Sequence, residues 1–129
     1  MVTDADKVIL KGRRVLIVED EDLIATLLED LLVKLECEVV SVATQLSEAV
    51  TMAKGKKFDV ALLDIMLEGL DVHPVMEVLA KRDIPYAFVT GYGLPRKTGL
   101  YAKGPILNKP ITLPGLKRVL REALVGKPG

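Results

Sequence analysis

Short apolar runs alternate with helical stripes along this chain, and this alternation restricts the fold more than any other feature. The segment 14–18, RVLIV, is apolar after its first residue, which is typical of a strand buried on both faces. Leucines in segment 22–36 then recur at the spacing of an amphipathic helix. Further strand-like segments lie at 39–43, 58–63, 84–90 and 104–108, with helical patterns after 46, 71 and 112.

Five strands that alternate with helices predict an α/β fold. The strands form a parallel sheet, right-handed crossovers connect them, and helices cover both faces. The helix expected between the fourth and fifth strands is the exception. The segment GYGLPRKTGLYAK at 91–103 contains three glycines and a proline, so we expect a short or irregular helix there.

Composition narrows the class of protein. A chain of 129 residues, 50% hydrophobic and 28% charged, fits one globular domain. Eighteen basic side chains balance eighteen acidic ones, so nothing indicates nucleic-acid binding. Cys37 is the only cysteine, which excludes an internal disulfide, disfavours zinc and fits a small buried apolar residue. The sequence lacks a signal-peptide core and a membrane-spanning run, so we expect a cytoplasmic protein without membrane contact.

Polar residues follow the predicted strands where each of them ends. Glu19 and Asp20 follow the first strand, and Asp64 follows the third. Thr90 ends the fourth strand, and Lys109 follows the fifth. Because ligands of such sheets bind outside the carboxyl ends of the strands, we expect all five side chains to surround one crevice.

The chemistry of this crevice follows from its charges. Three carboxylates repel one another and remain together only with a cation or a shared proton. Oxygen ligands without His or Cys indicate Mg²⁺. A carboxylate beside Mg²⁺ can attack phosphorus and form an aspartyl-phosphate. Thr90 and Lys109 then supply a hydroxyl and an ammonium for the phosphoryl oxygens.

Four motifs in this order resemble the receiver domains of two-component response regulators, over residues 13–125. They are VLIVEDE at the acidic pair, DVALLDIML around Asp64, FVTGYG at Thr90 and LNKP at Lys109. The resemblance implies a flavodoxin-like doubly wound sheet with strand order 2-1-3-4-5. It also implies an N-terminal extension at 1–12 and a C-terminal tail at 126–129. The chain is either a stand-alone receiver or part of a longer protein.

The same resemblance implies a role for each residue. Asp64 resembles the aspartate that a histidine kinase phosphorylates, and Asp20 resembles the direct Mg²⁺ ligand. Glu19 resembles the ligand that acts through water, and Met66 the residue whose backbone carbonyl binds the metal. Thr90 and Lys109 resemble the switch threonine and lysine. Such a domain signals to a downstream protein as a monomer or weak dimer and is not a classical enzyme.

The motif FVTGY further resembles a subgroup, found mainly in alphaproteobacteria, whose hallmark reads Phe-Ala-Thr-Gly-Tyr, with Val89 in place of alanine. Other departures concern the signal. Glu68 stands where the family often has proline, and Ile106 stands where the switch aromatic is usual. Tyr92 is a candidate substitute, and we hypothesise an order–disorder switch over 91–104. By the same resemblance the Lys109-Pro110 bond should be cis.

The same residues allow other interpretations. The acidic pair could be a solvated helix start, Thr90 a strand-end hydroxyl and Lys109 a surface lysine. A haloacid-dehalogenase-type phosphatase needs a second aspartate where Met66 stands, and a flavodoxin-like electron carrier would be repelled by EDEDL. A degenerate receiver that only binds a partner remains an alternative. His73 is expected to face solvent, because phosphodonor histidines lie on helical bundles.

Overall fold

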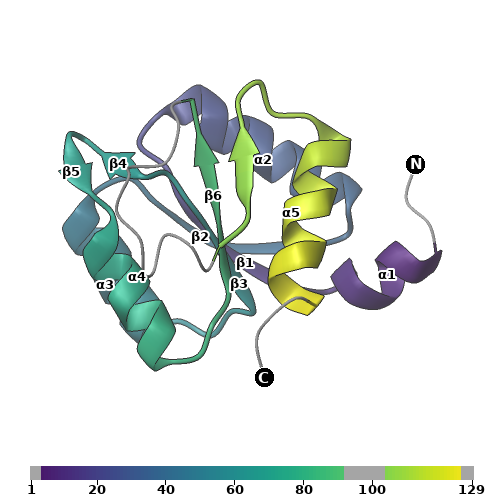
Figure 1. Cartoon of the computed structure of the whole chain (residues 1–129), viewed down its shortest axis with the longest axis horizontal. Helices are drawn as coiled ribbons and strands as arrows, with labels where there is room; N and C mark the ends of the chain where they lie inside the picture. Colours follow the sequence, from purple (N-terminus) through teal and green to yellow (C-terminus); the bar gives the residue numbers. More distant parts are fainter. Residues whose placement is uncertain (1–3, 92–103, 126–129) are drawn as a thin grey trace.

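Five parallel strands form one sheet in the order β2-β1-β3-β6-β7 (Figure 1). The computed structural model describes residues 4–91 and 104–125. The predicted order 2-1-3-4-5 is confirmed, since β6 and β7 are the fourth and fifth strands along the main sheet. The bounds of the strands are Arg14–Val18 (β1), Glu38–Ala43 (β2), Val60–Leu63 (β3), Tyr86–Thr90 (β6) and Ile106–Asn108 (β7).

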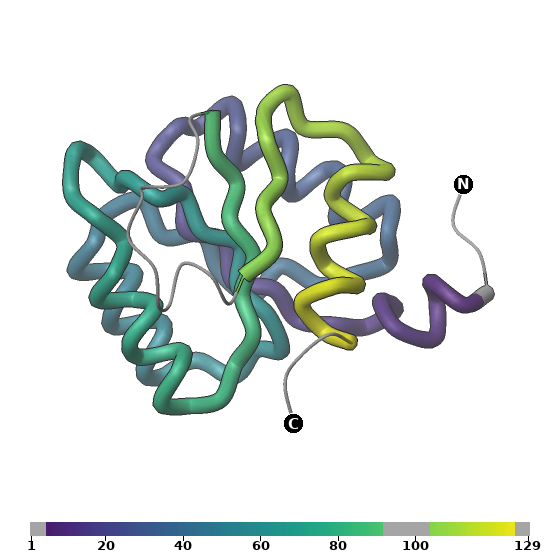
Figure 2. Tube along the Cα trace, viewed as in Figure 1, coloured from purple at the N-terminus to yellow at the C-terminus, as the bar shows by residue number. Residues whose placement is uncertain are grey.

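Helices cover both faces of the sheet, as predicted. In Figure 2, α2 (Asp22–Lys34) and α5 (Leu113–Val125) lie on one side, and α3 (Leu46–Gly55) and α4 (His73–Lys81) lie on the other. Successive residues of a strand point to opposite faces, so each strand contributes to two cores. In β1, Val15 and Ile17 pack with α2 and α5, whereas Leu16 and Val18 pack with α3 and α4.

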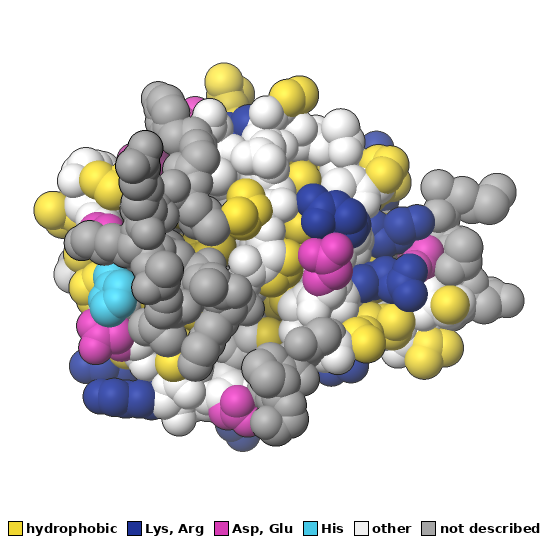
Figure 3. Space-filling model, in the orientation of Figure 1, with side chains coloured by type: hydrophobic (Ala, Val, Ile, Leu, Met, Phe, Trp, Pro, Cys, Tyr) yellow, Lys and Arg dark blue, Asp and Glu magenta, His cyan; other side chains and the backbone are white. Residues whose placement is uncertain are grey.

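The predicted N-terminal extension contains a helix, α1 (Asp4–Leu10), which packs against α5. Leu10 is fully buried in the α2–α5 core. Cys37 is buried as predicted, and its Sγ donates a hydrogen bond to the Leu10 carbonyl at 3.3 Å. Dark-blue Lys and Arg side chains gather over α5 and toward α1 (Figure 3). The helix α1 is therefore joined to the rest of the fold.

A small antiparallel hairpin, which the sequence did not predict, lies between β3 and α4. Its strands are β4 (Met66–Leu67) and β5 (Leu70–Asp71), and Leu67 pairs with Leu70. Glu68 and Gly69 connect them with φ values of 49° and 80°. A two-residue turn with both φ angles positive is the type I′ pattern, whose twist matches that of the flanking strands.

Several local predictions can be compared with the structure. The Lys109-Pro110 bond is cis, as expected. Thr112 caps α5, and its Oγ1 accepts a hydrogen bond from the Gly115 N–H at 3.1 Å. The N-cap position of α4 is Val72. Asp71 accepts a hydrogen bond from the first-turn N–H of His73 at 2.7 Å.

The irregular helix predicted before β7 lies outside the described residues, as do Tyr92 and most of the 91–104 segment. No helix in the described part of the chain is long and apolar enough to cross a membrane.

Candidate functional site

The carboxyl ends of β1, β3, β6 and β7 bring the predicted residues to one edge of the sheet. Sheet hydrogen bonds hold the backbone at each strand end. The Glu19 N–H donates to the Ala43 carbonyl, and the Asp64 N–H donates to the Val18 carbonyl, both at 2.9 Å. The Lys109 N–H donates to the Thr90 carbonyl at 3.0 Å. The site is therefore built on the rigid part of the fold.

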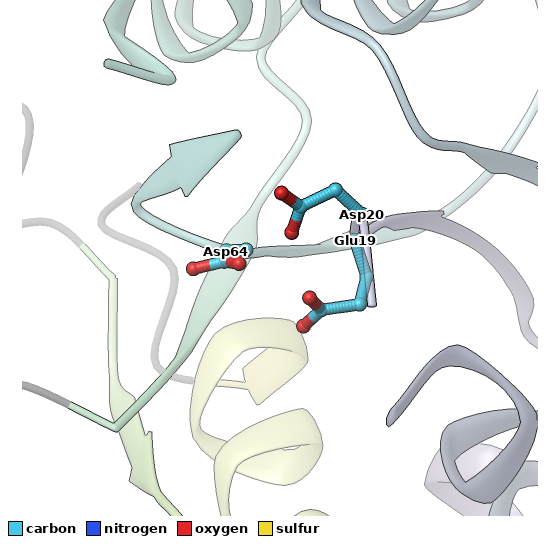
Figure 4. A group of neighbouring side chains, drawn as sticks. All are labelled: Glu19, Asp20 and Asp64. Carbon is cyan, nitrogen blue, oxygen red and sulfur yellow. The ribbon is translucent and has the colours of Figure 1, made fainter. Parts of the chain in front are cut away.

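Three carboxylates converge at this edge. Each of Glu19, Asp20 and Asp64 offers an oxygen that lies within 4.8 Å of an oxygen of the other two. Glu19 is 1% exposed, and the two aspartates are partly buried. Figure 4 shows Glu19 and Asp20 extending from the end of β1 toward Asp64 at the end of β3. The predicted acidic cluster is thus assembled in the structure.

The electrostatics of this cluster favour an added positive charge. Burial, and next the charge of Asp64, raise the pKa of Glu19 to about 8. Burial also raises the pKa of Asp64, although the Lys109 ammonium and the Met66 backbone N–H lower it. A carboxyl group with a raised pKa holds a proton that a metal ion could replace. The pair of Glu19 and Asp64 therefore needs either a shared proton or a cation.

The donor set fits Mg²⁺. All the ligand atoms that the cluster offers are carboxylate oxygens, the hard ligands that Mg²⁺ prefers. Glu19 Oε1 is buried and accepts no hydrogen bond from the residues that the structure describes. Its Oε2 accepts one from the Glu21 N–H at 3.2 Å. A buried oxygen with spare lone pairs is available to a cation or to a water that a cation holds.

Lys109 lies beside the same cluster, and Thr90 ends a strand at the same edge of the sheet. The Lys109 side chain is 22% exposed, and its Nζ lies 3.4 Å from Oε1 of Glu21. Thr90 is 2% exposed at the end of β6. Sequence reasoning missed Glu21 as the partner of the lysine. The sequence held the signal for it, since Glu21 is the third acid of the EDED run. In the structure Glu21 is the N-cap of α2.

The structure also places Met66, His73 and Asp20, which the sequence analysis named. The side chain of Met66 is 47% exposed, and the proposed metal contact of its carbonyl stays a prediction. His73 is on α4, where its Nδ1 lies 3.1 Å from Oε1 of Glu77. Its side chain is 45% exposed, so His73 faces solvent as expected. Asp20 has a partner that the sequence did not indicate, the backbone N–H of Glu68 at 2.9 Å.

Comparison with known proteins agrees with this architecture. The family model of the response regulator receiver domain matches residues 15–121. SdrG from Sphingomonas melonis is 37% identical, covers 88% of this chain and 98% of its own, and superposes with a TM-score of 0.78. No curated protein sequence matches the chain.

Two more solved structures extend the comparison. The anti-anti-sigma factor PhyR from Bartonella quintana is 28% identical over 95% of this chain, with a TM-score of 0.79, and this chain spans 51% of its length. The receiver domain of a sensor histidine kinase from Pseudomonas aeruginosa is 25% identical, with 88% of this chain and 98% of that chain covered and a TM-score of 0.74. That structure has a magnesium ion coordinated in its active-site cleft. The family match, the sheet order and the acidic cluster together make this chain a member of the response regulator receiver domain family.

Proposed function

We propose that this receiver domain takes a phosphoryl group onto Asp64 from the phosphohistidine of a histidine kinase. The observation that carries the proposal is the convergence of three carboxylate side chains at the strand ends, with Lys109 beside them. A structural acidic cluster would be paired with cations, whereas Lys109 is the one cation that the described residues bring to these carboxylates. That arrangement suits a site that receives a divalent cation and an anionic group in turn.

The transfer itself requires little from the protein beyond position and charge. A carboxylate oxygen of Asp64 attacks phosphorus as the P–N bond to the donor imidazole breaks. The electron pair of that bond stays on the imidazole nitrogen, which takes a proton from solvent. Mg²⁺, when held by Asp20, Asp64 and the Met66 carbonyl with Glu19 acting through water, supplies positive charge for the phosphoryl oxygens.

Lys109 and Thr90 provide the remaining donors. In the unphosphorylated chain the Lys109 ammonium is 3.4 Å from Glu21, at the rim of the crevice. The Lys109 ammonium is close enough to Asp64 to lower the pKa of that carboxyl group. A phosphoryl group on Asp64 brings stronger negative charge to the same place. We therefore expect the ammonium to exchange Glu21 for a phosphoryl oxygen, and the Thr90 hydroxyl to donate to another. Accepting one phosphoryl group in this way is signalling rather than turnover.

The output belongs to the same proposal. Residues 88–92 read FVTGY, and we place the chain in the subgroup with the Phe-Ala-Thr-Gly-Tyr hallmark. PhyR, which is similar over 95% of this chain, is named an anti-anti-sigma factor, a description of a protein that acts through protein contacts. By that analogy the phosphorylated domain changes its affinity for a downstream protein.

Labelling tests the proposal. The purified chain is incubated with a phosphorylated histidine kinase and Mg²⁺, and the acid-labile phosphoryl group on the chain is counted. Asp64→Asn should abolish labelling, and EDTA should do the same to the wild type. Asp83→Asn is the matched control, because Asp83 is exposed, precedes β6 at the opposite end of the sheet and has a φ of 60° that asparagine also adopts. Labelling of Asp64→Asn at the wild-type level would exclude Asp64 as the acceptor.

A further inference from the structure

The turn of the β4–β5 hairpin touches the metal site through its backbone. The Glu68 N–H donates a hydrogen bond of 2.9 Å to Oδ2 of Asp20, which comes from the end of another strand. In a two-residue hairpin turn the N–H of the first central residue has no partner within the hairpin. Asp20 therefore supplies the acceptor that this N–H needs, and the N–H restrains the carboxylate in return.

The hairpin is anchored well enough to act as a fixed donor. An isolated pair of two-residue strands has little stability of its own. Here Leu67 is fully buried in the core under α3 and α4. Behind the hairpin, the Val72 N–H donates to the Ile65 carbonyl at 2.9 Å, and Val72 is also fully buried. These contacts hold the turn against the rigid sheet, so the direction of the Glu68 N–H is set.

The backbone conformation at Glu68 is incompatible with the proline that the family often has at this position. Glu68 has a φ of 49°, and its N–H is the donor. Proline, which the family often has at this place, lacks the N–H and is restricted to a φ near −65°. A chain with proline here could form neither this turn nor this hydrogen bond. The departure noted in the sequence is thus linked to a specific contact.

We propose that the β4–β5 hairpin is a positioning element for the Mg²⁺ site, in which the Glu68 N–H orients the Asp20 carboxylate. The inference rests on the proposed function. A carboxylate has about four lone-pair positions, so one hydrogen bond to Oδ2 leaves the rest for a cation. The backbone of residue 68 and the left-handed turn set the affinity, and the Glu68 side chain does not. Residues that hold metal ligands in this way are typically worth 10–100-fold in metal affinity.

The main test measures Mg²⁺ affinity of the unphosphorylated protein by calorimetry or NMR titration. Glu68→Pro should weaken binding about tenfold. Glu68→Gln, which keeps the N–H and removes the charge, should bind within about twofold of the wild type. The amide proton of residue 68, shifted downfield by the carboxylate, should move upfield in Asp20→Ala. A folded Glu68→Pro variant with wild-type affinity would overturn the positioning role.

A pair of glycine variants covers the outcome in which Glu68→Pro fails to fold. Gly69 has a φ of 80° and Gly12, far from the site, has a φ of 77°, and a Cβ at either would meet no atom within 4 Å. Alanine at each therefore imposes similar backbone strain. Only Gly69→Ala should weaken Mg²⁺ binding, and equal affinities for the two variants would refute the inference. If the wild type bound no Mg²⁺ while remaining folded, the proposed function itself would fail. If Asp20→Ala lost Mg²⁺ affinity and the turn variants did not, only the role of the hairpin would be rejected.

Discussion

Two carboxylates are almost completely buried in the part of the chain that the structure describes, and their surroundings are opposite. Asp6 of α1 is 1% exposed and lies 3.2 Å from both Lys117 Nζ and Arg121 Nη1 of α5. Glu19 is equally buried, yet its close charged neighbours include the carboxylate of Asp64. Two cations form ion pairs with the first carboxylate, so it joins α1 to α5. The second lies beside Asp64, and repulsion is stored there when both carboxylates are ionised and no metal ion is bound.

This difference separates a stabilising contact from a functional one without reference to any relative. A buried charge with partners contributes to the folded state, and its loss leaves those partners uncompensated. A buried charge among like charges costs stability and persists when binding makes use of it. Removing a carboxylate should therefore lower the free energy of unfolding at the α1–α5 contact and raise it at the strand-end cluster.

The largest effect is expected at Asp6. Asp6→Ala should lower the free energy of unfolding by roughly 3 kcal/mol, the low end for breaking a buried ion pair. The low end is expected because the side chains of Lys117 and Arg121 are 23% and 45% exposed and can turn to solvent. Urea denaturation in the absence of Mg²⁺ measures it. Lys117→Ala and Arg121→Ala should each cost less, since Asp6 keeps one cation. Equal stability of Asp6→Ala and the wild type would show that the ion pairs of Asp6 contribute nothing to the fold.

Asp64 should respond in the other direction. At about pH 9, above the pKa of about 8 that burial and the charge of Asp64 give Glu19, both carboxylates are ionised. There Asp64→Asn removes a like charge from beside Glu19 and should raise the free energy of unfolding of the metal-free protein by about 1 kcal/mol. Mg²⁺ at a hundredfold excess over its dissociation constant should add about 2.7 kcal/mol to the wild type and much less to the variant. Thermal or urea unfolding with Mg²⁺ and with EDTA gives both values. A destabilised metal-free Asp64→Asn would contradict the stored repulsion.

The sequence was sufficient for the strand-end site because its position depends on topology. Apolar runs located β1, β3 and β6, and the rule that parallel strands end at one edge then brought Glu19, Asp20 and Asp64 together. No side-chain detail was needed for that step. The exact boundaries shifted by a residue or two, as at β3, which begins at Val60 rather than at Phe58.

The contacts that the sequence did not reveal depend on distant partners. The seven residues of α1 carry a weak pattern, and Val8 is 84% exposed while Leu10 is buried, so only α5 defines which side faces inward. The β4–β5 hairpin has two residues in each strand, too few for an alternation to be read. Its Glu-Gly turn is also less distinctive than Asn-Gly.

The smallest effect concerns a third kind of burial, that of a titratable group in its neutral form. Burial raises the pKa of the Cys37 thiol to about 11, from 9.0. The folded chain therefore keeps this proton at pH values where the unfolded chain has lost it. The resulting stability is complete below about pH 9 and is lost as the pH rises through about 11.

At pH 10 the wild type should have lost roughly 1 kcal/mol through Cys37 relative to pH 8. Cys37→Ala provides the control, because it removes this titration and keeps the lysine and tyrosine titrations of both states. The difference in unfolding free energy between the two proteins, followed from pH 8 to 11, isolates the thiol. Because Cys37 Sγ donates to the Leu10 carbonyl at the end of α1, its ionisation should also loosen α1. If the two proteins kept a constant difference over this range, burial of Cys37 would not be linked to the proton.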